Sequence, residues 1–183
     1  VQMNPNSVFA QRFHTIRAVE LAFDRSTADS AAAVYRELKG RYQAKALAKR
    51  LAHIELDAVY SSDLRRAADT ARVVADAQNL DLIQLPQLRE VDVGSWSGLT
   101  RAEIDERFGG VLIDGESREQ HRARVLEAIE RIARSHTGER ILVVTHGGTM
   151  RALHDQVSER PYHPVANCAV LEIHFRDDRF VAP

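Results

Sequence analysis

Short apolar runs bounded by turn residues recur along the chain, at 14–24, 56–62, 80–85 and 140–146. Runs of this length that are rich in β-branched residues predict strands. The run RILVVTH at 140–146 is apolar throughout its middle, which predicts a strand buried on both faces of a sheet. The last segments, 167–175 and 179–183, predict a hairpin that turns at Arg-Asp-Asp.

Segments with helical spacing separate these runs, at 30–53, 64–78, 100–108, 116–136 and 148–158. Leu47 and Leu51 lie four residues apart and predict one buried face, whereas Gly40 predicts a break or a weak point within the same helix. Ser-Ser-Asp at 61–63 predicts the N-cap of the second helix. Ser117 and Gln120 form a capping-box pattern at the start of the fourth helix, which we expect to end at Gly138.

Strands that alternate with helices predict an α/β fold, a three-layer sandwich with a mostly parallel central sheet and helices on both faces. The chain has 183 residues, enough for one sizeable core. We expect residues 14–183 to form a single domain. Residues 1–13 would be an extension outside it, partly disordered or foreign to the natural protein.

The formal net charge is −1, so the chain has no overall positive field to attract nucleic acid or an anionic membrane. No apolar run approaches the roughly 20 residues that span a bilayer. The single cysteine, Cys168, allows no disulfide within the chain and matches no zinc-binding spacing. We therefore expect a cytoplasmic protein with no metal, no membrane contact and no nucleic-acid partner.

Two strand ends lead into helices with polar residues at the junction. SSDLRRA at 61–67 places Arg66 in the first turn of a helix, where the helix dipole does not favour a cation. THGGT places His146 at a strand end, and Gly147 opens the next helix. Glycine lets backbone N–H groups approach an anion, and the helix start adds positive potential. Together the two junctions suit a phosphate group.

Four motifs occur in one order along the chain: SSDLRRAADTA at 61–71, LREVDVGSWSGLT at 88–100, GES at 115–117 and VVTHGG at 143–148. In this combination the chain resembles the histidine phosphatase superfamily, also called phosphoglycerate mutase-like. The similarity runs from about Gly40 to about Val170. It implies the fold of that family, a phosphomonoester or inorganic phosphate as ligand, and no cofactor.

The resemblance also implies roles for individual residues. Arg66 would clamp the phosphate, Glu90 would give a proton to the leaving oxygen, and His146 would brace the phosphoryl group. Arg17 and Gly147 would complete the phosphate-binding set. These roles are chemically coherent, because phosphoryl transfer needs its oxygen charges neutralised and the departing alkoxide protonated.

The nucleophile of the family, a histidine in an Arg-His-Gly motif at the end of the first strand, is missing. If Arg17 takes the place of the motif's arginine, Ala18 and Val19 stand where His and Gly belong. His14 lies near the beginning of the strand, roughly 13 Å from position 18 at about 3.3 Å per residue. The other histidines receive no role: His53, His121, His136, His154, His163 and His174.

Three functions stay open at this point. The first is a pseudoenzyme that binds phosphate and has lost most or all phosphatase activity, because alanine cannot attack phosphorus. The second is an active phosphomonoesterase that uses a substitute nucleophile or a water. The third is a non-catalytic interaction or regulatory protein. The substrate is not predicted, and a homodimer stays open.

Overall fold

A computed structural model describes residues 14–20 and 30–183. The predicted extension 1–13 and the end of the first apolar run, 21–24, lie outside the described residues. The elements are β1 (His14–Glu20), α1 (Ser30–Leu51), β2 (Ala58–Ser61), α2 (Arg65–Gln78), β3 (Leu82–Gln84), α3 (Arg101–Phe108), α4 (Arg118–Ser135), β4 (Arg140–Thr145), α5 (Gly147–Val157), β5 (Val170–Arg176) and β6 (Arg179–Val181).

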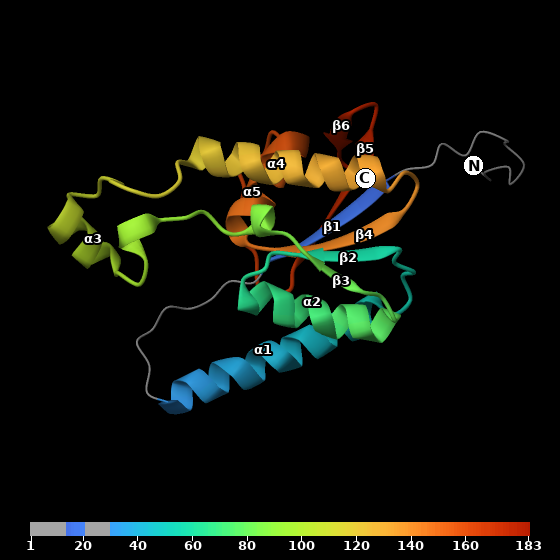
Figure 1. Cartoon of the computed structure of the whole chain (residues 1–183), viewed down its shortest axis with the longest axis horizontal. Helices are drawn as coiled ribbons and strands as arrows, with labels where there is room; N and C mark the ends of the chain where they lie inside the picture. The colour runs from blue at the N-terminus through green and yellow to red at the C-terminus, as the bar shows by residue number, and fades with distance from the viewer. Residues whose placement is uncertain (1–13, 21–29) are drawn as a thin grey trace, which may run out of the picture.

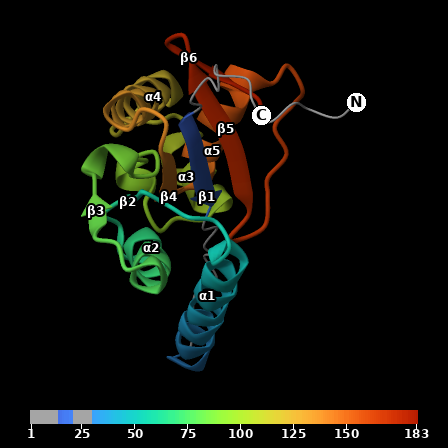
Figure 2. The ribbon, with the colours of Figure 1, turned by 90° about the vertical axis from the view of Figure 1, so that its right-hand side faces the viewer.

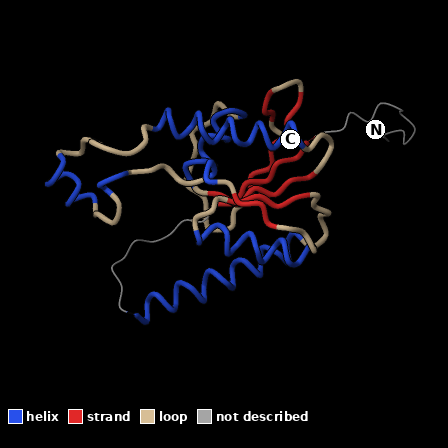
Figure 3. The backbone as a smooth tube through the Cα atoms, viewed as in Figure 1, coloured by secondary structure: helices blue, strands red, loops and turns tan. Residues whose placement is uncertain are grey.

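The strands form one sheet in the order β3-β2-β4-β1-β5-β6. The pairs β2–β3, β2–β4 and β1–β4 are parallel, whereas β5 runs antiparallel to β1 and to β6. Figure 1 shows α1 and α2 on one face of the sheet and α4 and α5 on the other. Figure 3 shows the strands as a thin layer between these helices. The predicted α/β sandwich with a mostly parallel sheet is confirmed.

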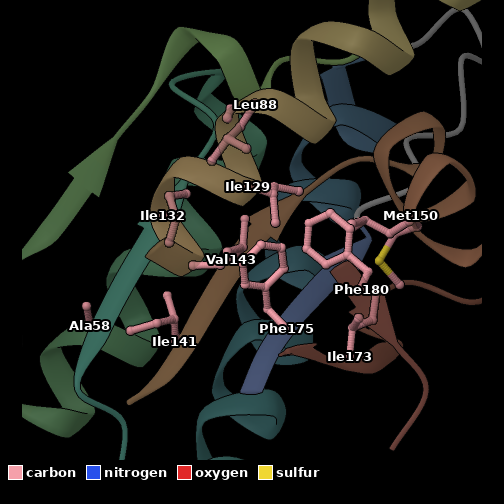
Figure 4. Close-up of a cluster of buried hydrophobic side chains, with 13 residues drawn as sticks. Ala58, Leu88, Ile129, Ile132, Ile141, Val143, Met150, Ile173, Phe175 and Phe180 are labelled. Carbon is pink, nitrogen blue, oxygen red and sulfur yellow. The ribbon is translucent and has the colours of Figure 1, made fainter. Parts of the chain in front are cut away.

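The side chains of β4 alternate between the two faces of the sheet, and each face has its own hydrophobic cluster. Ile141 and Val143 pack on the side of α4 and α5, in a cluster that includes Ile129 and Met150 (Figure 4). Leu142 and Val144 belong to the other cluster, which α1 and α2 cover. Because successive strand residues point to opposite faces, one wholly apolar strand supplies both clusters.

The helix starts agree with the predicted capping patterns at one place and differ at another. Ser117 and Gln120 cap each other's backbone, so the predicted capping box of α4 is confirmed. The predicted Ser-Ser-Asp cap of α2 is wrong, because α2 has Leu64 as its N-cap residue, without a side-chain bond. The Ser62 hydroxyl instead accepts the N–H of Leu64 at 3.2 Å and shapes the turn before the helix.

Neither of the two glycines singled out in the sequence ends a helix. Helix α1 continues through Gly40, since a single glycine weakens a helix but leaves its hydrogen bonds intact. Its Leu47 and Leu51 are buried as predicted. Helix α4 ends at Ser135, with His136 as its C-cap residue. Gly138 has a φ of +80° and serves the turn that leads into β4.

Helix α3 lies away from the sheet, at the end of an excursion between β3 and α4 (Figure 1). The two chain segments at its base are joined by Asp114, which accepts hydrogen bonds from the N–H and the hydroxyl of Ser95 at 2.9 and 2.7 Å. Gly94, with a φ of +49°, packs against the Asp114 backbone too closely for any side chain. The excursion is therefore closed at its base.

Candidate functional site

The carboxyl ends of β2 and β4 bring two helix starts together. The strands are parallel neighbours, with Ser61 paired to Val144, and the Ser62 N–H donates to the Val144 carbonyl at 3.0 Å. The chain then enters α2 after Leu64 and α5 after His146. Both helices start at this edge, so the sequence-predicted Arg66 and His146 lie at the same edge of the sheet. In open α/β sheets ligands bind at this edge.

His146 is almost fully buried, and neither of its ring nitrogens has a hydrogen-bond partner among the described residues. The hydroxyl of Thr149, the third residue of α5, is also buried and has no hydrogen-bond partner in the described part of the chain. Burial, and then the nearby Arg66 charge, lowers the pKa of His146 to about 3. At neutral pH the imidazole is therefore uncharged, with one N–H to donate and one lone pair to accept.

Arg66 and Arg65 behave differently although they are adjacent in the first turn of α2. Arg65 is exposed and pairs with Asp69 one turn along the helix. Arg66 is half-buried, and its charge is the one that acts on His146. The pair thus divides into a surface residue, Arg65, and Arg66, the residue that the family resemblance had selected.

The loop that carries Glu90 is fastened to both helix starts. Near the start of α2, Asp63 accepts two hydrogen bonds from Arg89, at 2.7 and 2.5 Å. These bonds lower the pKa of the Asp63 carboxyl. Near the start of α5, the Thr145 hydroxyl donates to the Leu88 carbonyl at 2.9 Å. Glu90 itself accepts the Gly148 N–H at 3.2 Å through Oε2. The carboxylate consequently rests on the first turn of α5, two residues from His146.

Three residues that the sequence left without a role support this arrangement. Arg124 of α4 forms a two-pronged pair with Glu116, at 2.7 and 2.6 Å, and donates to the Gln87 carbonyl at 2.7 Å. His121, buried in the first turn of α4, places Nε2 3.7 Å from Oε1 of Glu90. Glu116 belongs to the GES motif, so that motif was the one sequence signal pointing to this support.

The strand β1 lies in the middle of the sheet between β4 and β5 (Figure 2). Its backbone register pairs Arg17 with Leu142, Ala18 with Val143 and Glu20 with Thr145. Ala18 thus lies opposite the interior of β4, three residues before the level of His146. The next residue of the chain, Leu21, is outside the described residues. His14 is the first residue of β1, as predicted, at the opposite end of the strand.

A cavity of about 560 Å³ opens between α5 and the segment 160–171, and Met150, His154 and Tyr162 are among its lining residues. Within residues 14–20 and 30–183, no three His, Cys, Asp or Glu side chains are grouped so as to hold a metal. In the same part of the chain, no helix is long and apolar enough to cross a bilayer.

Comparison with known proteins extends these observations. The family model of the histidine phosphatase superfamily (branch 1) matches residues 37–182. A metal-independent phosphoserine phosphatase of Arabidopsis thaliana is 38% identical, over 78% of this chain and 66% of that protein. Phosphoserine phosphatase 1 of Hydrogenobacter thermophilus is 33% identical, over 63% of this chain and 61% of that protein. The chain thus spans slightly less than two thirds of these relatives.

Solved structures show the same fold. Bacillus stearothermophilus YhfR is 26% identical with a TM-score of 0.74, and the match covers 91% of this chain and 94% of that one. A mycobacterial glucosyl-3-phosphoglycerate phosphatase in complex with inorganic phosphate is 25% identical with a TM-score of 0.72, over 92% and 94% of the two chains. By its sequence and by its fold, this chain belongs to the histidine phosphatase superfamily.

Proposed function

We propose that this chain binds a phosphomonoester or inorganic phosphate between the starts of α2 and α5, and that its phosphatase activity is lost or weak. The observation that carries the binding proposal is His146, whose two buried ring nitrogens have no partner among the described residues. Buried polar groups are normally hydrogen-bonded. A phosphate oxygen beside Arg66 would supply the missing partner for one of these nitrogens.

Each residue of the site has a role that its chemistry suits. The Arg66 guanidinium balances phosphate charge, and His146 donates one N–H to a phosphate oxygen. The N–H of Gly147, the first residue of α5, adds a donor at a helix start that favours anions. Glu90 is the proton donor for a leaving oxygen. Arg17 of β1 is proposed as a further phosphate contact from the family pattern.

The weak activity follows from the residues available to attack phosphorus. Ala18 takes the nucleophile position if Arg17 matches the arginine of the family motif. An alanine side chain cannot form a phosphorylated intermediate, so this assignment predicts loss of the two-step reaction. Losing a nucleophile costs several powers of ten in rate while leaving binding residues in place.

The relatives support the class of ligand. Two of them are named phosphoserine phosphatases, and the mycobacterial neighbour is a phosphatase solved with inorganic phosphate. We further propose that residues 14–183 form one domain, because strands from both ends of this range pair in one sheet. The single, buried cysteine suits the proposed cytoplasmic location. The oligomeric state, including a homodimer, is left open.

A phosphomonoester panel tests the loss of activity. The purified chain is assayed for phosphate release, and samples quenched with detergent at alkaline pH are probed for a covalent phosphate that is lost on acid treatment, as phosphohistidine is. We expect turnover at or near background and no covalent intermediate. Robust turnover with phosphohistidine would overturn the proposal. Turnover without phosphohistidine that is abolished in H146A would favour an active enzyme with a substitute nucleophile or a water.

The alternative of an interaction protein that keeps only the fold makes a different prediction. Such a protein would gain no stability from phosphate, whereas a ligand at 100 times its Kd raises the free energy of unfolding by about 2.7 kcal/mol. Phosphate titrations followed by thermal unfolding therefore separate a binding site from a fold retained for its surface.

A further inference from the structure

His121 is a buried histidine that the phosphate-binding roles above do not use. It lies in the first turn of α4, whose start is fixed by the capping box of Ser117 and Gln120. The His121 N–H donates to the Ser117 carbonyl at 2.9 Å, as the helix requires. Its side chain is 5% exposed. A polar ring at such depth calls for a partner.

The partner in reach is the Glu90 carboxyl. Nε2 of His121 is 3.7 Å from Oε1 of Glu90, and it has no hydrogen-bond partner among the described residues. The same Oε1 accepts the Val91 N–H at 2.9 Å, while Oε2 accepts the Gly148 N–H. An approach of less than about 1 Å would bring Nε2 and Oε1 to hydrogen-bond distance. The backbone therefore holds the carboxyl, and the imidazole stands against one of its oxygens.

We infer that His121 is a positioning residue that shares one proton with the Glu90 carboxyl, so that Glu90 can donate this proton toward a bound phosphate. The inference deepens the proposed phosphate site and rests on it. With one proton on the pair, Nε2 accepts from the carboxyl O–H or donates to the carboxylate. When this proton leaves Glu90 for a phosphate oxygen, the pair is left as a carboxylate and a neutral imidazole, and it takes up its next proton from solvent.

Charges from every neighbouring element act on His121. Burial lowers its pKa most, and Arg124 of its own helix acts in the same direction. The carboxylates of Glu90 and Glu116 and a hydrogen bond with the Arg89 backbone raise the pKa. Across the site, His121 and His146 disfavour each other's charge. A ring that donates Nδ1–H to the Arg89 carbonyl keeps Nε2 as the lone pair that faces Glu90.

Nitrogen NMR on the protein without phosphate tests the shared proton directly. In uniformly ¹⁵N-labelled wild type, we expect neutral His121 to be the Nδ1–H tautomer. E90Q removes the carboxylate with little change of shape and should lower the titration midpoint of His121 by about one pH unit. An Nε2–H tautomer, or a midpoint that E90Q leaves unchanged, would overturn the inference whether or not phosphate binds.

His136 provides a matched control at the other end of the same helix. It lies after the last turn of α4, about 22 Å along the axis from His121 at 1.5 Å per residue. Its Nδ1 is 2.5 Å from Glu139, and its Nε2 is 2.8 Å from the Tyr60 hydroxyl. E139Q should change the His136 signals and leave those of His121 in place. A shift of His121 in E139Q would mean that its titration reports general charge and not Glu90.

Phosphate affinity gives a second readout that separates this inference from the proposed site. For H121Q, the slope of log Kd for inorganic phosphate against pH should fall by up to one unit, because one linked proton is lost. Binding by wild type with the same slope in H121Q would overturn the inference and leave the phosphate site standing. No binding by wild type would overturn the proposed site, while the tautomer and midpoint would still decide whether His121 and Glu90 share a proton.

Discussion

Gly148 and Glu90 are in direct contact, and the contact depends on the absence of a side chain. The Gly148 N–H donates to Oε2 of Glu90 at 3.2 Å. A Cβ at position 148 would overlap the Glu90 carboxylate and lie 2.9 Å from Cε1 of His121. The second glycine of the His-Gly-Gly motif therefore makes room for the carboxyl and the imidazole that stand beside the proposed phosphate site.

G148A should therefore destabilise the protein by about 1–3 kcal/mol, because the surrounding side chains must shift to admit the methyl group. Chemical denaturation measures this change. G40A is the matched control: Gly40 lies within α1 with nothing near its added Cβ, so alanine should stabilise by about 0.4–1 kcal/mol. Equal stabilisation by both substitutions would contradict the packing described for Gly148.

R66A should abolish the rise in melting temperature that phosphate gives the wild type, since Arg66 is the charge that acts on His146. R65A is the control, because Arg65 is exposed and its ion pair in the described part of the chain is with Asp69 on the same helix surface. Thermal unfolding at increasing phosphate concentration measures both variants. A phosphate effect that survives in R66A but disappears in R65A would assign the anion to the helix surface.

The buried state of His146 predicts a loss of stability in acid. The folded protein keeps this ring neutral down to a pKa of about 3, whereas the unfolded chain takes up the proton below its ordinary value of 6.5. Stability from this group is thus complete above pH 6.5 and declines as the pH falls toward 3, by about 5 kcal/mol in total. Urea denaturation between pH 4 and 7 should show a shallower decline for H146Q. Identical pH dependence in the two proteins would contradict this assignment.

R124M should destabilise the protein by about 2–3 kcal/mol and loosen the loop that carries Glu90. The substitution leaves the half-buried Glu116 without its partner and frees the Gln87 carbonyl. R134M, on the same helix, breaks exposed pairs with Glu130 and Asp178 and a cation–π contact with Phe175, and should cost about 1 kcal/mol or less. Denaturation midpoints and amide exchange of residues 86–93 measure the two effects.

The sequence predicted the parts of the site that follow directly from strand ends. Arg66 and His146 each come just after a strand, and parallel strands bring their carboxyl ends to one edge of the sheet. The same patterns predicted a mostly parallel sheet but not the order of its strands, because spacing along the chain does not specify which strands are neighbours. The Ser-Ser-Asp cap failed since a serine can shape the turn before a helix as well as cap it.

His121 and Arg124 could not be assigned from the sequence, because their roles depend on how α4 packs against a loop about 30 residues earlier in the chain. Nothing in the spacing of α4 separates these two residues from other polar positions on its surface. The same limit applies to Ala18. The sequence shows that the motif's histidine is absent. Which residue of β1 lies beside which residue of β4 depends on the register between the two strands, and spacing along the chain does not specify that register.

A crystal structure grown with saturating inorganic phosphate tests the central claim most directly. The account predicts a phosphate within hydrogen-bond distance of the Arg66 guanidinium and of a ring nitrogen of His146, with the first N–H groups of α5 pointing toward it. Saturating phosphate that leaves these groups in contact with only protein or water would contradict the proposed site.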